Sequence, residues 1–183
     1  LDDVSMQIKR GEIHGMCGEN GAGKSTLMKI LSGVYPYGTY EGTILYEGVE
    51  LKLAEGSIQQ AMKDGIAIVY QELTLVPNMT VGENVFLGKE PTEAGMINWN
   101  KVYSDTREIL TKYKLDVAPH VPVKELGVGK MQMVEIAKAL SENAKILILD
   151  EPTSALNEAE IAKLMEILHT LKSHGVTCIY ISH

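Results

Sequence analysis

The sequence predicts an α/β fold in which helices flank a mostly parallel β-sheet. Three observations favour this fold. Short apolar runs alternate with amphipathic stretches, one apolar run leads directly into a glycine-rich loop and a helix-prone segment, and another ends in a carboxylate. A strand that feeds a loop and then a helix is typical of buried, parallel sheets. At 183 residues the chain is long enough for a single domain with a substantial core.

The expected strands are short and apolar. Alternating residues Val4, Met6 and Ile8 predict a half-exposed strand before a turn at 9–12. Buried strands are expected at Ile13–Cys17, Ile66–Tyr70, Lys145–Asp150 and Thr177–Ile181. An antiparallel β hairpin region is expected at Gly42–Tyr46 and Glu50–Leu53, joined across Glu47 and Gly48.

Helices are expected between these strands, at Ser25–Ser32, Ile58–Lys63 and Glu158–Ser173. Between 80 and 143 strand periodicity is absent, and three more helices are expected at Thr80–Phe86, Asn98–Tyr113 and Gly129–Ser141. Asn98 is the expected N-cap of the second of these. The change of pattern predicts an inserted α-helical subdomain at about 79–143, within a core subdomain at about 1–78 and 144–183.

A glycine-rich loop follows the strand expected at 13–17. Residues Gly18–Ser25 match the phosphate-binding pattern G-x-x-x-x-G-K-[ST] without a gap. The glycines let consecutive backbone N–H groups close around phosphates, Lys24 can reach the β- and γ-phosphates, and the Ser25 hydroxyl can ligate Mg²⁺. The chain is therefore predicted to bind a nucleoside triphosphate through a P-loop. The predicted contacts are Gly18, Glu19, Asn20, Gly21, Ala22, Gly23, Lys24, Ser25 and Thr26.

A second apolar strand delivers the acidic half of the site. Residues 146–149 are apolar and are followed directly by Asp150 and Glu151. Ligands of open α/β sheets bind at the carboxyl ends of the strands, so Asp150 is the expected Mg²⁺ partner. Glu151 points elsewhere and is suited to orient and deprotonate an attacking water.

Composition and charge exclude several classes of function. The net charge of −7 comes without a basic cluster, so we expect no nucleic acid as the main partner. No apolar run approaches the about 20 residues that cross a bilayer, and no signal pattern is present, so a cytoplasmic chain is expected. Cys17 and Cys178 lack metal-ligand spacing and are expected to be reduced core residues. Both ends fall in strand patterns, which predicts a piece of a longer protein.

Five motifs in order resemble those of ATP-binding-cassette (ABC) ATPases. They are the Walker A loop at Gly18–Ser25, the Q-loop at Gln71, the signature at Leu126–Lys130, Walker B with the D-loop at Ile146–Leu156, and the switch histidine His183. More narrowly, residues 35–42, 71–77 and 133–140 resemble the ATP-binding subunits of bacterial monosaccharide importers of the xylose or multiple-sugar branch.

The resemblance implies roles for residues that the P-loop alone does not assign. Gln71, Glu151 and His183 would form the catalytic group, and Ser25, Gln71 and Asp150 would hold Mg²⁺. The signature would close over a nucleotide held by a second cassette in a head-to-tail dimer, through Leu126, Gly127, Val128, Gly129 and Lys130. A helix that begins at Gly129 would aim its N–H groups at that γ-phosphate.

The resemblance also implies partners. A transmembrane permease would dock at 70–88, and a periplasmic sugar-binding protein would be a partner only indirectly. The cassette would be peripheral, at the cytoplasmic face of the inner membrane. Importers of this branch hold two cassettes in one polypeptide, so this chain is expected to be the first of the two.

The signature departs from the family pattern Leu-Ser-Gly-Gly-Gln. Gly127 stands in the serine place, Val128 in the first glycine place and Lys130 in the glutamine place. Loss of the serine hydroxyl removes a bond to a charged phosphate worth about 1.5–3 kcal/mol. The composite site that this signature completes is therefore hypothesised to be weak. Asn157 replaces the aspartate common after Ser-Ala-Leu, and the aromatic that stacks on adenine is expected before Leu1.

The sequence therefore predicts an ATP-binding and hydrolysing subunit that energises import of a monosaccharide, with ATP and Mg²⁺ as cofactors. Two alternatives stay open. One is a regulatory or weakly hydrolysing nucleotide-binding module, which the altered signature motivates. The other is a soluble ABC ATPase of DNA repair or translation, against which the acidic balance argues.

Overall fold

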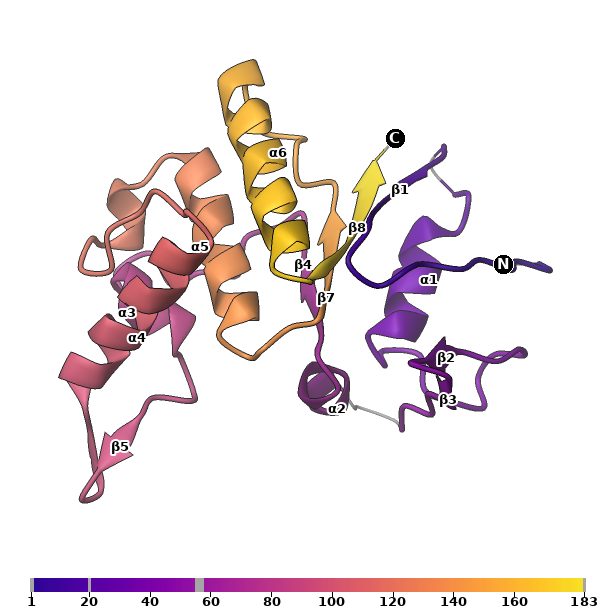
Figure 1. The fold of residues 1–183 in the computed structure, drawn as a ribbon, viewed down its shortest axis with the longest axis horizontal. Helices are drawn as coiled ribbons and strands as arrows, with labels where there is room; N and C mark the ends of the chain where they lie inside the picture. The colour runs from indigo at the N-terminus through magenta and orange to yellow at the C-terminus, as the bar shows by residue number, and fades with distance from the viewer. Residues whose placement is uncertain (1, 20, 55–57, 183) are drawn as a thin grey trace.

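A computed structural model describes residues 2–19, 21–54 and 58–182. The roles predicted for Asn20 and His183 fall on residues outside that range and stay predictions. A four-stranded parallel sheet with strand order β1-β8-β7-β4 lies at the centre (Figure 1). Its strands are β1 (Ile13–Cys17), β4 (Ile66–Val69), β7 (Ile146–Asp150) and β8 (Thr177–Ser182). The α/β fold with a parallel sheet is confirmed.

The helices fall where their patterns predict them, within a few residues at each end. They are α1 (Lys24–Leu31), α2 (Ile58–Lys63), α3 (Val81–Val85), α4 (Trp99–Lys112), α5 (Val128–Leu140) and α6 (Glu158–Ser173), with a 3₁₀ turn at Val123–Glu125. Side chains of Thr80, Asn98 and Asn157 cap α3, α4 and α6, as these residue types favour. Within the described residues, α1 and α5 instead follow Gly23 and Gly127 and have no side-chain cap.

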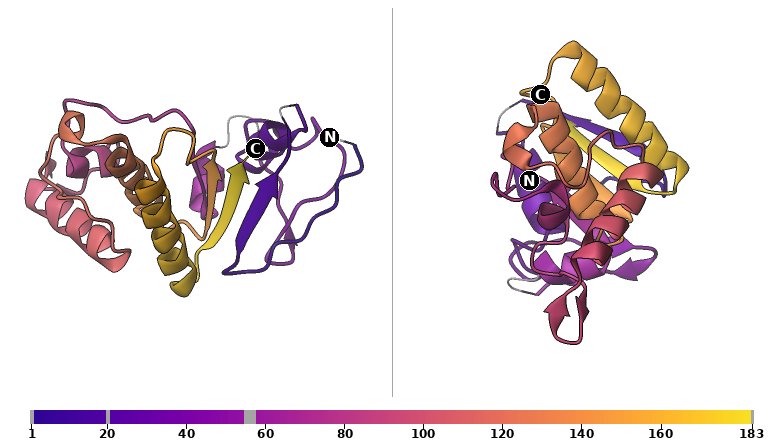
Figure 2. Two further views of the ribbon diagram at one scale, coloured as in Figure 1. Left: turned by 90° about the horizontal axis from the view of Figure 1, so that it is seen from above. Right: turned by 90° about the vertical axis from the view of Figure 1, so that its left-hand side faces the viewer.

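Helices cover both faces of the sheet, and strands β4, β7 and β8 are largely buried. The prediction of a buried strand at Ile13–Cys17 is wrong in its burial, because β1 lies at the edge of the sheet and none of its residues is fully buried. Figure 2 shows α5 and α6 on one side of the sheet and α1 on the other. Successive side chains of a strand point to opposite faces. Leu147, Leu149 and Cys178 therefore belong to the cluster under α5 and α6, whereas Ile148 and Ile179 pack with residues of α1 and α2. Continuous apolar runs in β7 and β8 are the consequence.

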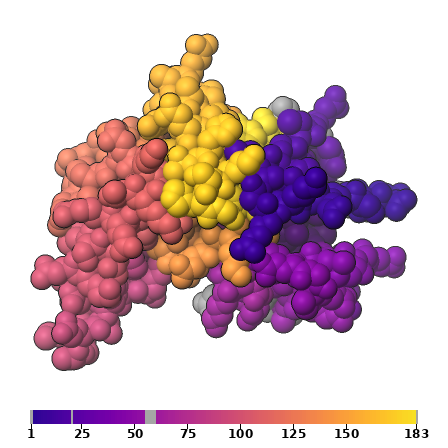
Figure 3. Space-filling model, in the orientation of Figure 1, coloured from indigo at the N-terminus to yellow at the C-terminus, as the bar shows by residue number. Residues whose placement is uncertain are grey.

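Two short hairpins lie outside the main sheet. The expected one forms between β2 (Leu45–Tyr46) and β3 (Val49–Glu50). A second one, between β5 (Thr92–Glu93) and β6 (Met96–Ile97), contradicts the prediction that strands are absent from 80–143. Two-residue strands are too short to show a period of two, and left-handed turn residues Ala94 and Gly95 close the hairpin. It projects from the body of the molecule (Figure 3).

Two predictions at the start of the chain are wrong. Residues 4–8 form no strand, since no other described segment pairs with them, and Val4 is 55% exposed and Met6 40%. Cys17 is an exposed free cysteine rather than a core residue, because it is the last residue of a strand at the edge of the sheet. Cys178 is free and buried as expected, and burial raises the pKa of its thiol to about 12.

The helical region packs directly on the sheet. Helix α3 packs against α4 and α5, and α5 also contacts β4. One hydrophobic cluster includes Val81 and Val85 of α3, Leu110 of α4, Leu147 of β7 and Leu168 of α6. Because this cluster runs through both regions, the boundaries at 79–143 stay a prediction.

Candidate functional site

Four strands end at one edge of the sheet and bring the predicted motifs together. All four run parallel, so their carboxyl ends lie on the same side. The glycine-rich loop follows β1, Gln71 lies two residues after β4, Asp150 ends β7, and Ser182 ends β8. Open α/β sheets bind their ligands at this edge.

Two residues of the glycine-rich loop bond the side chain of Lys24. Its ammonium donates hydrogen bonds to the carbonyl oxygens of Gly18 and of Glu19, the latter at 3.1 Å. Gly21 and Gly23 have φ angles of 85° and 93°, which a residue with a Cβ rarely adopts. The loop therefore needs glycine at both places to place its cation among backbone groups.

The first turn of α1 offers backbone N–H groups to an anion. Gly23, the N-cap, has no side chain to accept them, and the first turn contains no acidic residue. Unsatisfied N–H groups and the helix dipole both favour an anion at such a helix start. With the Lys24 ammonium beside it, this geometry fits the phosphates of a nucleotide.

Oxygen donors for a divalent cation come from three neighbouring elements. The Ser25 hydroxyl lies in the first turn of α1, and Asp150 and Gln71 lie at the ends of the adjacent parallel strands β7 and β4. Hydroxyl, carboxylate and amide oxygens are ligands that Mg²⁺ accepts, usually together with phosphates and water. The described residues contain no cluster of three or more His, Cys, Asp or Glu side chains that could hold a metal alone. The donor set fits a cation that a nucleotide helps to bind.

The Asp150 carboxylate affects the pKa of Tyr70, the residue after the end of β4. Partial burial raises the pKa of the Tyr70 hydroxyl, and the negative charge of Asp150 raises it further. Asp150 is therefore close enough to act on the residue that precedes Gln71.

Glu151 lies in a turn of unusual backbone conformation. Its φ angle is 45°, in the left-handed region that residues other than glycine rarely adopt. Its N–H donates to the carbonyl of Ile181 at 3.0 Å, and its carbonyl accepts from the N–H of Ser154 at 3.2 Å. These two bonds hold the sharp turn that follows the end of β7 at Asp150.

Gln71 contacts the segment that follows Glu151. Its amide nitrogen donates to the Ser154 hydroxyl over 3.5 Å, and both side chains are exposed. The neighbouring Thr153 hydroxyl bonds the hydroxyl of Tyr180 on β8 at 2.8 Å. The structure thus brings Gln71 next to Ser154, 83 residues further along the chain, a contact that sequence spacing alone does not reveal.

The signature residues have partners on other elements. Leu126 packs against the main core cluster, Val128 is 42% exposed, and Lys130 pairs weakly with Asp116 at 4.0 Å. The N–H of Gly129 donates to Oε1 of Glu160 on α6 at 3.3 Å. The start of the signature helix is therefore beside a carboxylate of the same chain.

Glu160 holds the start of α6 and is not among the predicted site residues. Its Oε2 accepts from the N–H of Asn157 at 3.0 Å, while Asn157 Oδ1 accepts from the N–H of Glu160 at 3.0 Å. The pair is a capping box, and the spacing Asn-x-x-Glu is its signal in the sequence. A Cβ on Gly129 would lie 2.7 Å from Oε1 of Glu160, so this approach requires glycine. Asn157, noted as a departure from the family pattern, thus caps α6.

Comparison with known families decides the identity of the chain. A family model described as "ABC transporter" matches residues 1–154. The chain belongs to this family. None of the helices among the described residues of this ABC cassette has the length and apolar character needed to span a membrane.

Curated relatives of this ABC chain include sugar import proteins. It is 62% identical to "Xylose import ATP-binding protein XylG" of Thermoanaerobacter pseudethanolicus, over 100% of this chain and 36% of that protein. It is 52% identical to "L-arabinose transport ATP-binding protein AraG" of Geobacillus stearothermophilus, over 100% of this chain and 35% of that protein. The chain thus spans about a third of the length of these relatives.

Solved ABC structures share the fold. The cbiO1 protein of Clostridium perfringens, part of the complex cbiONQ, superposes with a TM-score of 0.82 at 28% identity, over 98% of this chain and 70% of that one. The cassette MJ0796, solved as a dimer in a post-hydrolysis state with ADP and Pi, gives a TM-score of 0.76 at 28% identity, over 97% of this chain and 77% of that one.

Proposed function

We propose that this chain is the ATP-binding and hydrolysing part of an importer for a monosaccharide, a pentose or hexose such as xylose. The observation on which the proposal rests is the glycine-rich loop, whose Gly18 and Glu19 carbonyl oxygens accept from the Lys24 ammonium and which leads into a helix whose N-cap is a glycine. The relatives that import xylose and L-arabinose support the transport class and the sugar class.

In the proposed reaction, loop N–H groups and Lys24 bind the β- and γ-phosphates of ATP. Bound Mg²⁺, held by Ser25, Asp150 and Gln71, would neutralise developing phosphate charge. Glu151 orients a water and accepts its proton as the water attacks the γ-phosphorus, and ADP leaves. His183 is proposed to keep that water and Glu151 in line.

A second cassette is proposed to complete the site. In the head-to-tail arrangement, the signature of one cassette faces the nucleotide of the other, so ATP binding closes the pair and hydrolysis reopens it. A related cassette that was solved as a dimer with ADP and Pi supports this arrangement. The N–H groups at the start of α5 would then face the γ-phosphate.

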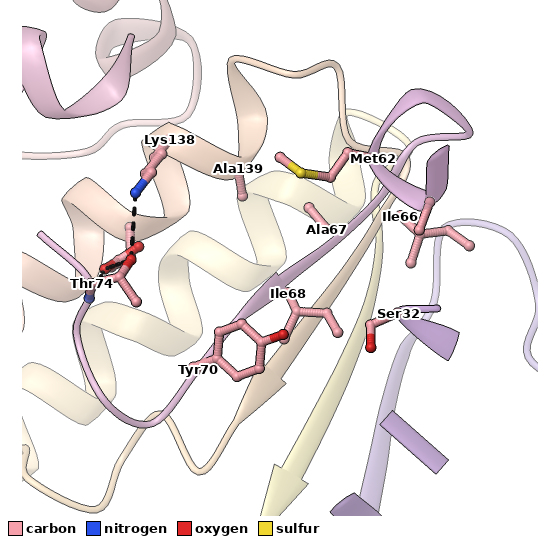
Figure 4. Close-up of a pocket in the computed structure, with 11 residues that line it drawn as sticks. Ser32, Met62, Ile66, Ala67, Ile68, Tyr70, Thr74, Lys138 and Ala139 are labelled. Atoms are coloured by element: carbon pink, nitrogen blue, oxygen red, sulfur yellow. Dashed lines mark hydrogen bonds between the residues drawn. The ribbon is translucent and has the colours of Figure 1, made fainter. Parts of the chain in front are cut away.

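A permease is the proposed membrane partner, with its docking surface at 70–88. A cavity of about 170 Å³ lies beside this segment, between α2, β4 and α5. Figure 4 shows Tyr70, Ile68 and Met62 around it, with Thr74 and Lys138 at one end. A mostly apolar hollow of this size with a polar end suits one side chain of a docked membrane protein. The cassette would work at the cytoplasmic face of the membrane, and a periplasmic binding protein would be linked to it only through the permease.

The experiment that tests the proposal replaces Glu151 by Gln in the full-length protein reconstituted with its permease. We expect ATP turnover to fall about 100- to 10,000-fold, because the general base is lost. ATP binding, followed by calorimetry with magnesium, should persist because the phosphate loop is unchanged. Uptake of labelled xylose and L-arabinose into vesicles should fall with turnover.

Turnover that is unchanged in the Glu151→Gln protein would contradict the proposed chemistry. Absence of ATP-driven uptake of any monosaccharide by the wild-type complex would contradict the proposed transport.

The altered signature favours a second candidate, a regulatory module that closes on ATP and turns over little. Gly127 offers no hydroxyl to a phosphate, and the Gly129 N–H is already bonded to Glu160. Phosphate release in a single turnover separates the two functions. The ATPase proposal expects release that requires Glu151, whereas a switch expects closure without release.

A further inference from the structure

The segment that contains Gln71 is anchored to the signature helix by a buried carboxylate. Oε1 of Glu135, on α5, accepts from the N–H of Thr74 at 2.5 Å and from its hydroxyl at 2.9 Å. Glu135 is only 8% exposed, although it is charged. Buried carboxylates are rare unless they are hydrogen-bonded, and here both bonds go to one residue of the Q-loop.

A second side chain of α5 completes this anchor. The Lys138 ammonium donates to the Thr74 hydroxyl at 3.4 Å, as Figure 4 shows. Glu135 and Lys138 are three positions apart on one helix, so they lie on the same face. The Thr74 hydroxyl is therefore held between an acceptor and a donor of the same helix, at the end of the cavity beside β4.

The anchor leaves only a short length of chain for Gln71. β4 ends at Val69 and Thr74 is fixed on α5, so Gln71 lies in an irregular stretch between two fixed points. At the far side of Thr74, the buried Asn84 of α3 accepts from the N–H of Val76 at 2.7 Å. A displacement of α5 relative to the sheet would therefore move one end of the short stretch that contains Gln71.

We propose that Glu135 is a positioning residue that couples the signature helix to Gln71 through Thr74. α5 begins at Val128, and Glu135 lies seven residues further along, about 10 Å along the helix axis. Gln71 contacts Ser154, next to the Walker B turn. Movement of the signature in the composite site is thus passed to the amide at the chain's own nucleotide site. The proposal rests on the catalytic role proposed for Gln71.

The test measures ATP turnover by the full-length protein with its permease, for Glu135→Ala, Gln71→Ala and the double variant. We expect Glu135→Ala, which removes both bonds to Thr74, to lower kcat about 10- to 100-fold, the range for hydrogen bonds to a charged group. KM for ATP should stay within about twofold, because Lys24 and its loop are untouched. In the Gln71→Ala background, Glu135→Ala should lower kcat no further, since both changes disable one step.

Two conservative variants separate bonding from a general loss of structure. Glu135→Gln keeps the acceptor oxygen without its charge and should lower kcat only about two- to threefold. Thr74→Val removes the hydroxyl and keeps the N–H bond. If the Glu135→Ala protein does not fold, Thr74→Val takes its place in the comparison with Gln71→Ala and the double variant. The matched control is Glu142→Ala, which removes a 2.6 Å bond to Lys89 near the end of α5 and should leave kcat unchanged.

Three results would overturn the inference. In the first, the Glu135→Ala or Thr74→Val protein has the wild-type kcat, whereas Gln71→Ala lowers kcat. Another is an equal further loss of kcat in the Gln71→Ala background, because an additive effect places Glu135 outside the Gln71 pathway. The third is Gln71→Ala at the wild-type rate, which removes the role proposed for Gln71 and the inference with it.

Discussion

Helices α1 and α5 begin alike and differ in what lies at their first turns. Both follow a glycine N-cap, and neither has a side-chain cap within the described part of the chain. At α1, Gly23 has a φ angle of 93° and Lys24 folds back over the loop. At α5, Gly127 is extended, and the Gly129 N–H meets the carboxylate of Glu160 at 3.3 Å.

The comparison teaches that an uncapped helix start is not by itself prepared for an anion. The N–H groups of α1 have the Lys24 ammonium beside them, so both the helix start and this cation attract a phosphate. A phosphate at α5 would meet a negative charge of the chain's own Glu160. At α1 the glycine-rich loop and the cation both belong to this chain, whereas the start of α5 must change its contacts before it can face a nucleotide.

The largest effect is expected at the start of α1. Lys24→Ala should lower ATP turnover by the full-length protein about 100- to 1000-fold, because the donor proposed for the transferred phosphate is lost. The control Lys29→Ala removes the same charge from the last turn of α1, beside Tyr35, and should leave turnover within about twofold. Phosphate release at saturating ATP measures both. Equal losses would break the comparison, since position relative to the loop would not matter.

The next largest effect is expected at the signature, where restoring the polar side chains of the family pattern should raise ATP turnover. Gly127→Ser combined with Lys130→Gln should raise turnover about 10- to 100-fold, the value of one hydrogen bond to a charged phosphate. A Cβ at Gly127 meets no atom within 4 Å, and the lost ion pair with Asp116 is exposed and long at 4.0 Å. Lys124→Gln, which removes the same charge outside the signature, is the control. An unchanged rate would count against a weak composite site.

A smaller effect is expected from crowding the start of α5. Gly129→Ala places a Cβ 2.7 Å from Oε1 of Glu160 and should displace the carboxylate that bonds the Asn157 N–H. Loss of a cap costs about 0.5–2 kcal/mol, so exchange of the Asn157 amide should speed up about 2- to 30-fold. Gly127→Ala, in open space, is the control. Equal exchange of the Asn157 amide in the two variants would show that the Glu160 side chain can move away from the new Cβ without losing its bond to Asn157.

The smallest effect is expected from the charge of Glu160. Glu160→Gln keeps the side-chain shape and removes the charge beside the Gly129 N–H, so the ATP concentration for half-maximal turnover should fall about two- to fivefold. Glu158→Gln, in the same first turn of α6, is the matched control and should leave that concentration unchanged. A rise in the Glu160→Gln protein, measured at low salt, would mean that the carboxylate assists nucleotide binding.

Local patterns predicted most of the elements correctly. Both Asn98 and Asn157 cap helices in the structure. Asn98 was predicted to do so, whereas Asn157 was noted only as a departure from a motif. At residues 4–8, in contrast, a strand was predicted and does not form. Their alternation is a valid strand pattern, but a strand requires a partner in space, and periodicity does not supply one.

The sequence by itself determined the phosphate loop, because a loop of consecutive residues closes through backbone angles that Gly21 and Gly23 permit. It also determined the parallel sheet, because strands buried on both faces must be apolar throughout. Only the tertiary structure decided that Glu135 meets Thr74 and that Glu160 meets Gly129, 61 and 31 residues apart in the chain. Such contacts depend on how helices pack across the sheet, which no local pattern of residues encodes.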